Sequence, residues 1–179
     1  MLQFPTLLPW DSLHPLIIHF PIALLLVSPL FILISAVLAP PKGRPYMVAA
    51  LILLLLGTAS LFLAVQTGEA AGALAERTPP VEALLQGHQT LASETRNVFV
   101  TLSIIALGVF FFPRLLRKER PLLSRVLPLS FLVFYAVGII FLVNTADRGG
   151  RLVHELGVHA IISPTSEKPA ASPGNPTPE

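Results

Sequence analysis

The chain has 179 residues, of which 53% are hydrophobic and 12% are charged, and it contains no cysteine. Soluble domains carry about 25% charged residues, so a mean hydropathy of +0.73 leaves too little polar surface for a soluble enzyme or a disordered chain. The lack of cysteine excludes disulfides, iron–sulfur clusters, thiolate zinc sites and covalently attached c-type haem. A formal net charge of only +2 offers no electrostatic footprint for nucleic acid, which leaves a small integral membrane protein.

Four apolar stretches approach or exceed the length of about 20 residues that a membrane-spanning helix needs. We expect spans at about 16–39, 46–65, 95–112 and 126–145. The third stretch is the shortest, and the helix-compatible residues before it can extend it toward the N-terminus. The pattern predicts an all-α fold, an integral membrane four-helix bundle formed by residues 1–162.

The pair Gly149-Gly150 predicts a break at the end of the fourth helix. After this break, residues Arg151 to Ile162 are expected to fold back over the mouth of the bundle as a short interfacial segment. Residues 163–179 contain five prolines and no apolar run. This composition cannot bury enough apolar area to offset chain entropy, so a disordered Pro-rich tail is expected.

The distribution of charge predicts the orientation of the bundle. Two short loops, one after the first span and one after the third, hold seven Lys or Arg residues and one Glu, a net charge of +6. The remaining segments hold five Lys or Arg residues and nine acids, a net charge of −4. By the positive-inside rule, both termini and the loop between spans two and three lie outside. In a bacterium this is a multi-pass protein of the inner (cytoplasmic) membrane with periplasmic N- and C-termini.

All five histidines fall on the predicted outer side: His14, His19, His88, His154 and His159. Imidazole is the usual ligand of haem b, and a histidine at membrane depth suggests a functional site. A single interfacial histidine is more often an amphipathic anchor, so the prediction of a cofactor site depends on several histidines acting together. No residue is predicted to be catalytic, and the chain is not expected to be an enzyme by itself.

Helix rise places two of these histidines at similar heights. We count about 20 residues outward from the inner ends of spans one and three, at a rise of about 1.5 Å per residue. This count places His19 at the outer edge of the hydrocarbon. It places His14 and His88 farther out, beyond that edge. Depth therefore favours His14 with His88 as haem iron ligands, whereas burial favours His19 with His88. Within the pairs His14/His19 and His154/His159 the spacing of five residues corresponds to about 140°, so the members of a pair do not share a helix face.

Bundle cores commonly hold cofactors between facing helices, and haem b needs only axial ligands and an apolar slot. All five histidines are thus candidate cofactor-binding residues, with His14, His19 and His88 as candidate ligands of the haem iron. Just after span two, Gly68 and Gly72 lie four residues apart. This spacing is typical of close helix packing rather than of a catalytic site.

Two segments carry a resemblance to a known family. Residues 13–24 (LHPLIIHFPIAL) and residues 149–158 (GGRLVHELGV) resemble the opening HPxxxHFPIAL and closing GGxLVxxxGV motifs of the domain of unknown function 2231 membrane family. The resemblance covers roughly residues 12–160. Many members carry a histidine directly before the closing GVGV, where this chain has Leu156, so the resemblance supports His14, His19 and His88 better than His154 and His159.

Members of this family are expected to be four-helix membrane proteins, and some occur fused to or beside cytochrome c or Rieske-type domains. That association implies a haem b-binding subunit for electron transfer in, or anchoring of, a respiratory or photosynthetic redox complex. Expected partners are other membrane redox subunits, a periplasmic cytochrome c or similar protein, the lipid bilayer and a quinone, with no nucleic acid. The alternative is a cofactor-free structural membrane subunit that docks a periplasmic partner. A transporter is disfavoured because it should carry polar residues at mid-membrane, where these spans offer little beyond the hydroxyls of Ser28, Ser35, Thr58, Ser60, Thr101, Ser103 and Ser130.

The charge asymmetry generates a test of orientation. A reporter that is active only in the periplasm should work when fused after Glu179 and should fail when fused at Gly43 or Lys118, because these two positions lie in the basic loops. Reporter activity is measured in intact cells, with a cytoplasm-only reporter at the same sites as the control. The reverse pattern would overturn the predicted orientation.

Overall fold

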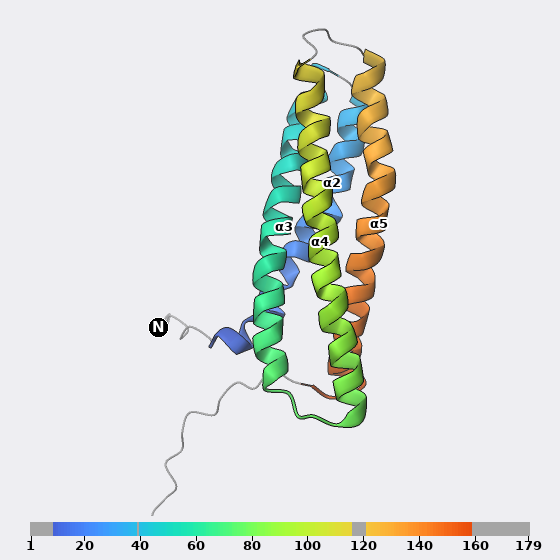
Figure 1. Cartoon of the computed structure of the whole chain (residues 1–179). Helices are drawn as coiled ribbons and strands as arrows, with labels where there is room; N and C mark the ends of the chain where they lie inside the picture. The colour runs from blue at the N-terminus through green and yellow to red at the C-terminus, as the bar shows by residue number, and fades with distance from the viewer. Residues whose placement is uncertain (1–8, 39, 116–120, 159–179) are drawn as a thin grey trace, which may run out of the picture.

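The computed structural model describes residues 9–38, 40–115 and 121–158, and the regular structure of these residues is entirely helical (Figure 1). A 3-10 turn and a short helix precede four long helices: η1 (Trp10–Ser12), α1 (His14–Ile17), α2 (His19–Leu38), α3 (Arg44–Ala73), α4 (Pro79–Leu115) and α5 (Pro121–His154). Four helical segments, the first being α1 with α2, are long and apolar enough to cross a membrane. The expected all-α four-helix bundle is confirmed.

Helix α1 and the C-terminal turns of α5, the first and the last α-helices described, lie at the same end of the bundle, which we call the terminal end (Figure 1). The terminal end comprises α1, the C-terminal turns of α3 and α5, and the first turns of α4. The C-terminal ends of α2 and α4 and the N-terminal ends of α3 and α5 lie at the opposite end (Figure 1). This arrangement brings segments that are far apart in sequence together at the terminal end.

Helices α3 and α4 extend beyond the expected spans at the terminal end. Helix α3 continues past residue 65 to Ala73, and α4 begins at Pro79, well before residue 95. Proline suits the first turn of a helix, where an amide N–H has no intrahelical partner in any case. These additional turns carry Thr67 and His88, so the terminal end is a helical cap rather than a set of loops.

The expected break at Gly149-Gly150 is wrong, because α5 continues through both glycines to His154. Glycine inside a helix costs about 1 kcal/mol relative to alanine, which a packed helix tolerates. The helix ends instead before Gly157, whose φ of 67° suits a residue without a Cβ. Of the expected interfacial segment, Arg151 to His154 is helical, whereas residues 159–162 and the tail 163–179 lie outside the described residues.

Two prolines shape the first helical segment. Pro21 has no N–H to offer the carbonyl of Ile17, and the segment is interrupted at Ile18, between α1 and α2. Helix α1 packs on α3, whereas α2 packs on both α3 and α5. The interruption therefore directs His14, the first residue of α1, toward the end of α3.

The second proline, Pro29, leaves the carbonyl of Leu25 without an amide partner four residues on. The hydroxyl of Tyr135 on α5 donates a hydrogen bond to this carbonyl at 2.8 Å. Tyr135 is 1% exposed and its ring packs edge-on against Phe99 and Phe131, with centroids 5.7 and 5.8 Å away. The hydroxyl thus satisfies, across the bundle, a polar group that the proline frees.

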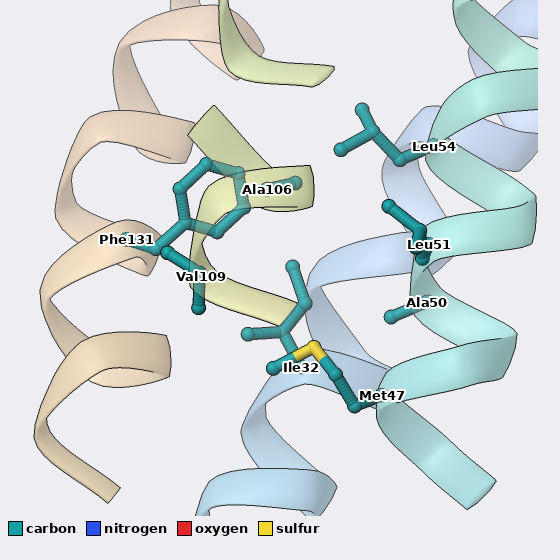
Figure 2. Close-up of a pocket in the computed structure, with 8 residues that line it drawn as sticks. All are labelled: Ile32, Met47, Ala50, Leu51, Leu54, Ala106, Val109 and Phe131. Carbon is teal, nitrogen blue, oxygen red and sulfur yellow. The ribbon is translucent and has the colours of Figure 1, made fainter. Parts of the chain in front are cut away.

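Other hydrogen bonds and tight apolar contacts join the remaining helices. Ser28 donates to the carbonyl of Ala50 at 3.0 Å, and the hydroxyls of Thr58 and Ser103 lie 2.9 Å apart. Toward the end of the bundle opposite the terminal end, residues of α2, α3, α4 and α5 enclose an apolar void of only about 10 Å³ (Figure 2). Large apolar side chains cover the outside of the bundle, as a lipid-facing surface requires: Val133, for example, is 70% exposed.

Removing the Tyr135 hydroxyl tests whether it is needed because Pro29 leaves the Leu25 carbonyl without an amide partner. We expect Tyr135→Phe to lower the free energy of unfolding by about 1–3 kcal/mol, because the Leu25 carbonyl is then buried without a partner. The matched control is Tyr46→Phe, at a residue that is 37% exposed. In the Pro29→Ala background the restored amide should reduce the cost of Tyr135→Phe, and equal costs in both backgrounds, measured by unfolding in detergent, would contradict this explanation.

Candidate cofactor site

A cavity of about 370 Å³ lies at the terminal end of the bundle. Every helix from α1 to α5 contributes to its wall, which is mainly apolar and includes Ile18, Leu61, Val65, Leu142 and Val153. Three histidines also line it: His14 from α1, His88 from α4 and His154 from α5. The helices thus bring together, at one cavity, three of the five histidines that the sequence predicts as cofactor-binding residues.

His14 is held by the last turns of α3. Its Nδ1 lies 3.3 Å from the hydroxyl oxygen of Thr67, a residue that is 0% exposed. The Thr67 hydroxyl donates within its own helix to the carbonyl of Leu63 at 2.8 Å, so its oxygen is the acceptor toward His14. Because Thr67 accepts, His14 is the donor.

His88 is held by α5 in a similar way. Its Nδ1 lies 3.1 Å from the backbone carbonyl oxygen of Thr145, which can only accept, so Nδ1 carries the proton and donates. In a neutral imidazole this leaves Nε2 unprotonated. No hydrogen bond occupies Nε2 of His14 or of His88 within residues 9–38, 40–115 and 121–158.

A glycine lies against each of these two rings. A Cβ placed on Gly68 would come within 2.8 Å of the Cε1 atom of His14, and a Cβ placed on Gly149 would come within 3.0 Å of the Cε1 atom of His88. Real Cβ atoms are essentially never found closer than 3.0 Å. A side chain at position 68 would therefore clash with the His14 ring, and one at position 149 would require the His88 ring to shift by a few tenths of an ångström.

A hydroxyl pair fixes α4 and α5 next to the His88 hydrogen bond. The hydroxyl oxygens of Thr95 and Thr145 lie 2.7 Å apart, and Thr95 is 1% exposed. Because Thr145 supplies both this hydroxyl and the carbonyl that binds His88, the pair sets the register of the two helices at the cavity.

The other three histidines differ in position. His154 lines the cavity but is exposed, at the last residue of α5. His19 is exposed and is not among the residues that line the cavity, as expected from the angle of about 140° between it and His14. Burial within the bundle therefore favours His14 over His19, which corrects the expectation that burial favours His19 and agrees with the argument made from depth in the membrane. His159 lies outside the described residues.

Sequence reasoning missed the residues that hold the histidines. Gly68 was assigned to helix packing and Gly149 to a helix break, whereas each lies against an imidazole. The packing interpretation fits Gly72, where a Cβ would come within 2.8 Å of the side-chain amide of Gln89 on α4. Thr67 gave a sequence signal only as part of residues 67–71, which fall where the resembled family has a small-residue turn, and Thr145 gave none.

Comparisons with known proteins gave one match. The family model described as "Predicted membrane protein (DUF2231)" matches residues 11–161, which is most of the chain and includes all the helices described above. Neither the curated proteins nor the solved structures compared with the chain gave a match.

Proposed function

The chain belongs to the DUF2231 family of predicted membrane proteins, and we propose that it binds haem b between His14 and His88 and serves as an electron-transfer or anchoring subunit of a membrane redox complex. The observation that carries the proposal is the convergence of two imidazoles from different helices on one cavity, each with Nδ1 engaged and Nε2 without a hydrogen bond among the described residues. An Nδ1–H donor that fixes the ring and leaves Nε2 as ligand is the arrangement common to metal-binding histidines.

The donor set fits haem better than a metal ion bound by protein alone. Structural and catalytic metal sites use three or four protein ligands, and among the described residues no group of three His, Cys, Asp or Glu side chains is close enough to hold an ion. Haem b supplies four ligands of its own and requires two imidazoles at most. The apolar wall of the cavity suits a macrocycle with hydrocarbon faces.

When bound, haem b would supply one-electron redox chemistry. The protein's contribution would be binding and orientation: His14 and His88 would hold the haem iron, Thr67 and the Thr145 carbonyl would orient the two imidazoles, and the apolar side chains would surround the macrocycle. His154 at the rim is proposed as a cofactor contact rather than as a ligand, because it is exposed.

The charge distribution supports the proposed location. With the two basic loops in the cytoplasm, the terminal end and its cavity face the periplasm of a bacterial inner membrane. Proposed partners are other membrane redox subunits, a periplasmic cytochrome c or a similar carrier, and a quinone from the lipid phase. A cofactor-free structural subunit that docks a periplasmic protein is the function that remains if no haem binds.

The test is the absorption spectrum of the purified protein in detergent, after expression with a haem supply and reduction with dithionite. We expect the spectrum of a b-type haem, quantified by the pyridine haemochrome assay. His14→Ala and His88→Ala should each abolish or strongly reduce it, because each removes one proposed axial ligand. The matched control is His19→Ala, which removes an exposed imidazole five residues from His14 and should leave the spectrum unchanged.

Folding is monitored separately, so that loss of haem is not confused with loss of structure. His88→Gly, which leaves room beside α5, should regain the spectrum when free imidazole is added. A wild-type protein that folds and inserts but shows no haem absorption would overturn the proposal, and so would equal haem content in the wild type and in His14→Ala and His88→Ala.

A further inference from the structure

The two hydrogen-bonded imidazoles use the same local device on two different helices. In each case a glycine on one helix lies against an imidazole from another helix: Gly68 on α3 lies against His14, and Gly149 on α5 lies against His88. The absence of a Cβ lets a ring from a neighbouring helix come close to the backbone. A main-chain carbonyl has two lone pairs, so it can accept from the imidazole while it accepts from the helix amide.

We propose that Thr67 with Gly68, and the Thr145 carbonyl with Gly149, are positioning elements that hold His14 and His88 in the Nδ1–H tautomer before any ligand binds. The site then presents two Nε2 lone pairs. The inference deepens the proposed function, since it specifies the chemical class of ligand that the cavity takes: an electron-pair acceptor such as a metal centre, in preference to an anion or another group that needs a hydrogen-bond donor.

The hydroxyl of Thr67 determines which nitrogen of His14 carries the proton, because it can act toward His14 only as an acceptor. It has a single hydrogen, which the 2.8 Å contact to the Leu63 carbonyl uses, with a second backbone carbonyl, that of Ala64, at 3.1 Å. Its oxygen can therefore only accept from Nδ1 of His14, at 3.3 Å. An unconstrained neutral imidazole favours the opposite tautomer, with the proton on Nε2. The effect of Thr67 can therefore be measured as a shift of His14 toward the Nδ1–H tautomer.

At His88 the acceptor is a backbone atom, which a side-chain substitution cannot remove. The approach of the ring to that acceptor depends on Gly149, because a Cβ there would lie 3.0 Å from Cε1. Replacing Gly149 by alanine should push the ring away from α5 and weaken its hydrogen bond to Thr145. Gly108, where an added Cβ would meet no described atom within 4 Å, offers the same chemical change without this effect.

The experiment is nitrogen NMR of the haem-free full chain in detergent micelles, with ¹⁵N-labelled histidine, at a pH about two units above the ordinary histidine pKa of about 6.5. Nitrogen shifts and their couplings to ring protons report which nitrogen of each ring carries the proton. In the wild type we expect the Nδ1–H form at His14 and His88, and the Nε2–H form to be substantial at the exposed His19.

Thr67→Val should shift His14 toward the Nε2–H form and leave His88 unchanged. The matched control is Thr101→Val, at an exposed threonine that donates within α4 to Asn97 and contacts no imidazole. Gly149→Ala should shift His88 toward the Nε2–H form and leave His14 unchanged, whereas Gly108→Ala should move neither.

The Nε2–H form at His14 and His88 in the wild type would overturn the inference, as would an unchanged tautomer in both Thr67→Val and Gly149→Ala. The readout needs no haem, so it separates the two proposals. If the tautomers are as expected and no haem binds, the proposed function fails and the lone-pair site remains. If haem binds and the variants leave the tautomers unchanged, the positioning role fails by itself.

Discussion

Inside a bilayer a polar group has no water to bond, so its partner must come from the protein. The bundle meets this constraint throughout the described residues, where no buried side-chain nitrogen or oxygen lacks a hydrogen-bond partner. The constraint determines the relations between helices. Pro29 frees the Leu25 carbonyl, and Tyr135 crosses the bundle to bind it. Thr58 and Ser103 join α3 to α4, and Thr95 and Thr145 join α4 to α5. Apolar packing alone would leave the helices free to slide, since lipid tails are as apolar as leucine.

The terminal end uses the same rule for a different purpose. There the polar partners are two imidazoles, and each is satisfied at Nδ1 only. Glycine has a role in both halves of the bundle: Gly57 and Gly138 admit the side chains of Leu25 and Leu102, whereas Gly68 and Gly149 admit imidazole rings. The small void toward the opposite end, about 10 Å³, contrasts with the 370 Å³ cavity between the histidines. The cavity between the histidines is therefore much larger than the apolar void toward the opposite end.

The all-helical fold with four spans followed from the sequence, because apolar length is a property of single segments. The similar height of His14 and His88 also followed, since helix rise is fixed and both helices continue that far. Three features did not follow. Glycine pairs end helices when they are solvated, but Gly149 is packed against His88, and α5 continues. His19 was placed by depth, yet the rotation of α2 leaves it outside the cavity. Thr67 binds His14 from 53 residues away, a contact that no local pattern encodes.

The most direct test of the central claim, that two imidazoles from α1 and α4 bind one haem, is the electron paramagnetic resonance spectrum of the oxidised, haem-loaded protein. Two strong imidazole ligands make ferric haem low-spin, so the account predicts a low-spin signal from one haem per chain. His14→Ala and His88→Ala should each convert any residual haem to a high-spin form with one protein ligand. A high-spin signal in the wild type, or a low-spin signal that survives both substitutions, would contradict the account.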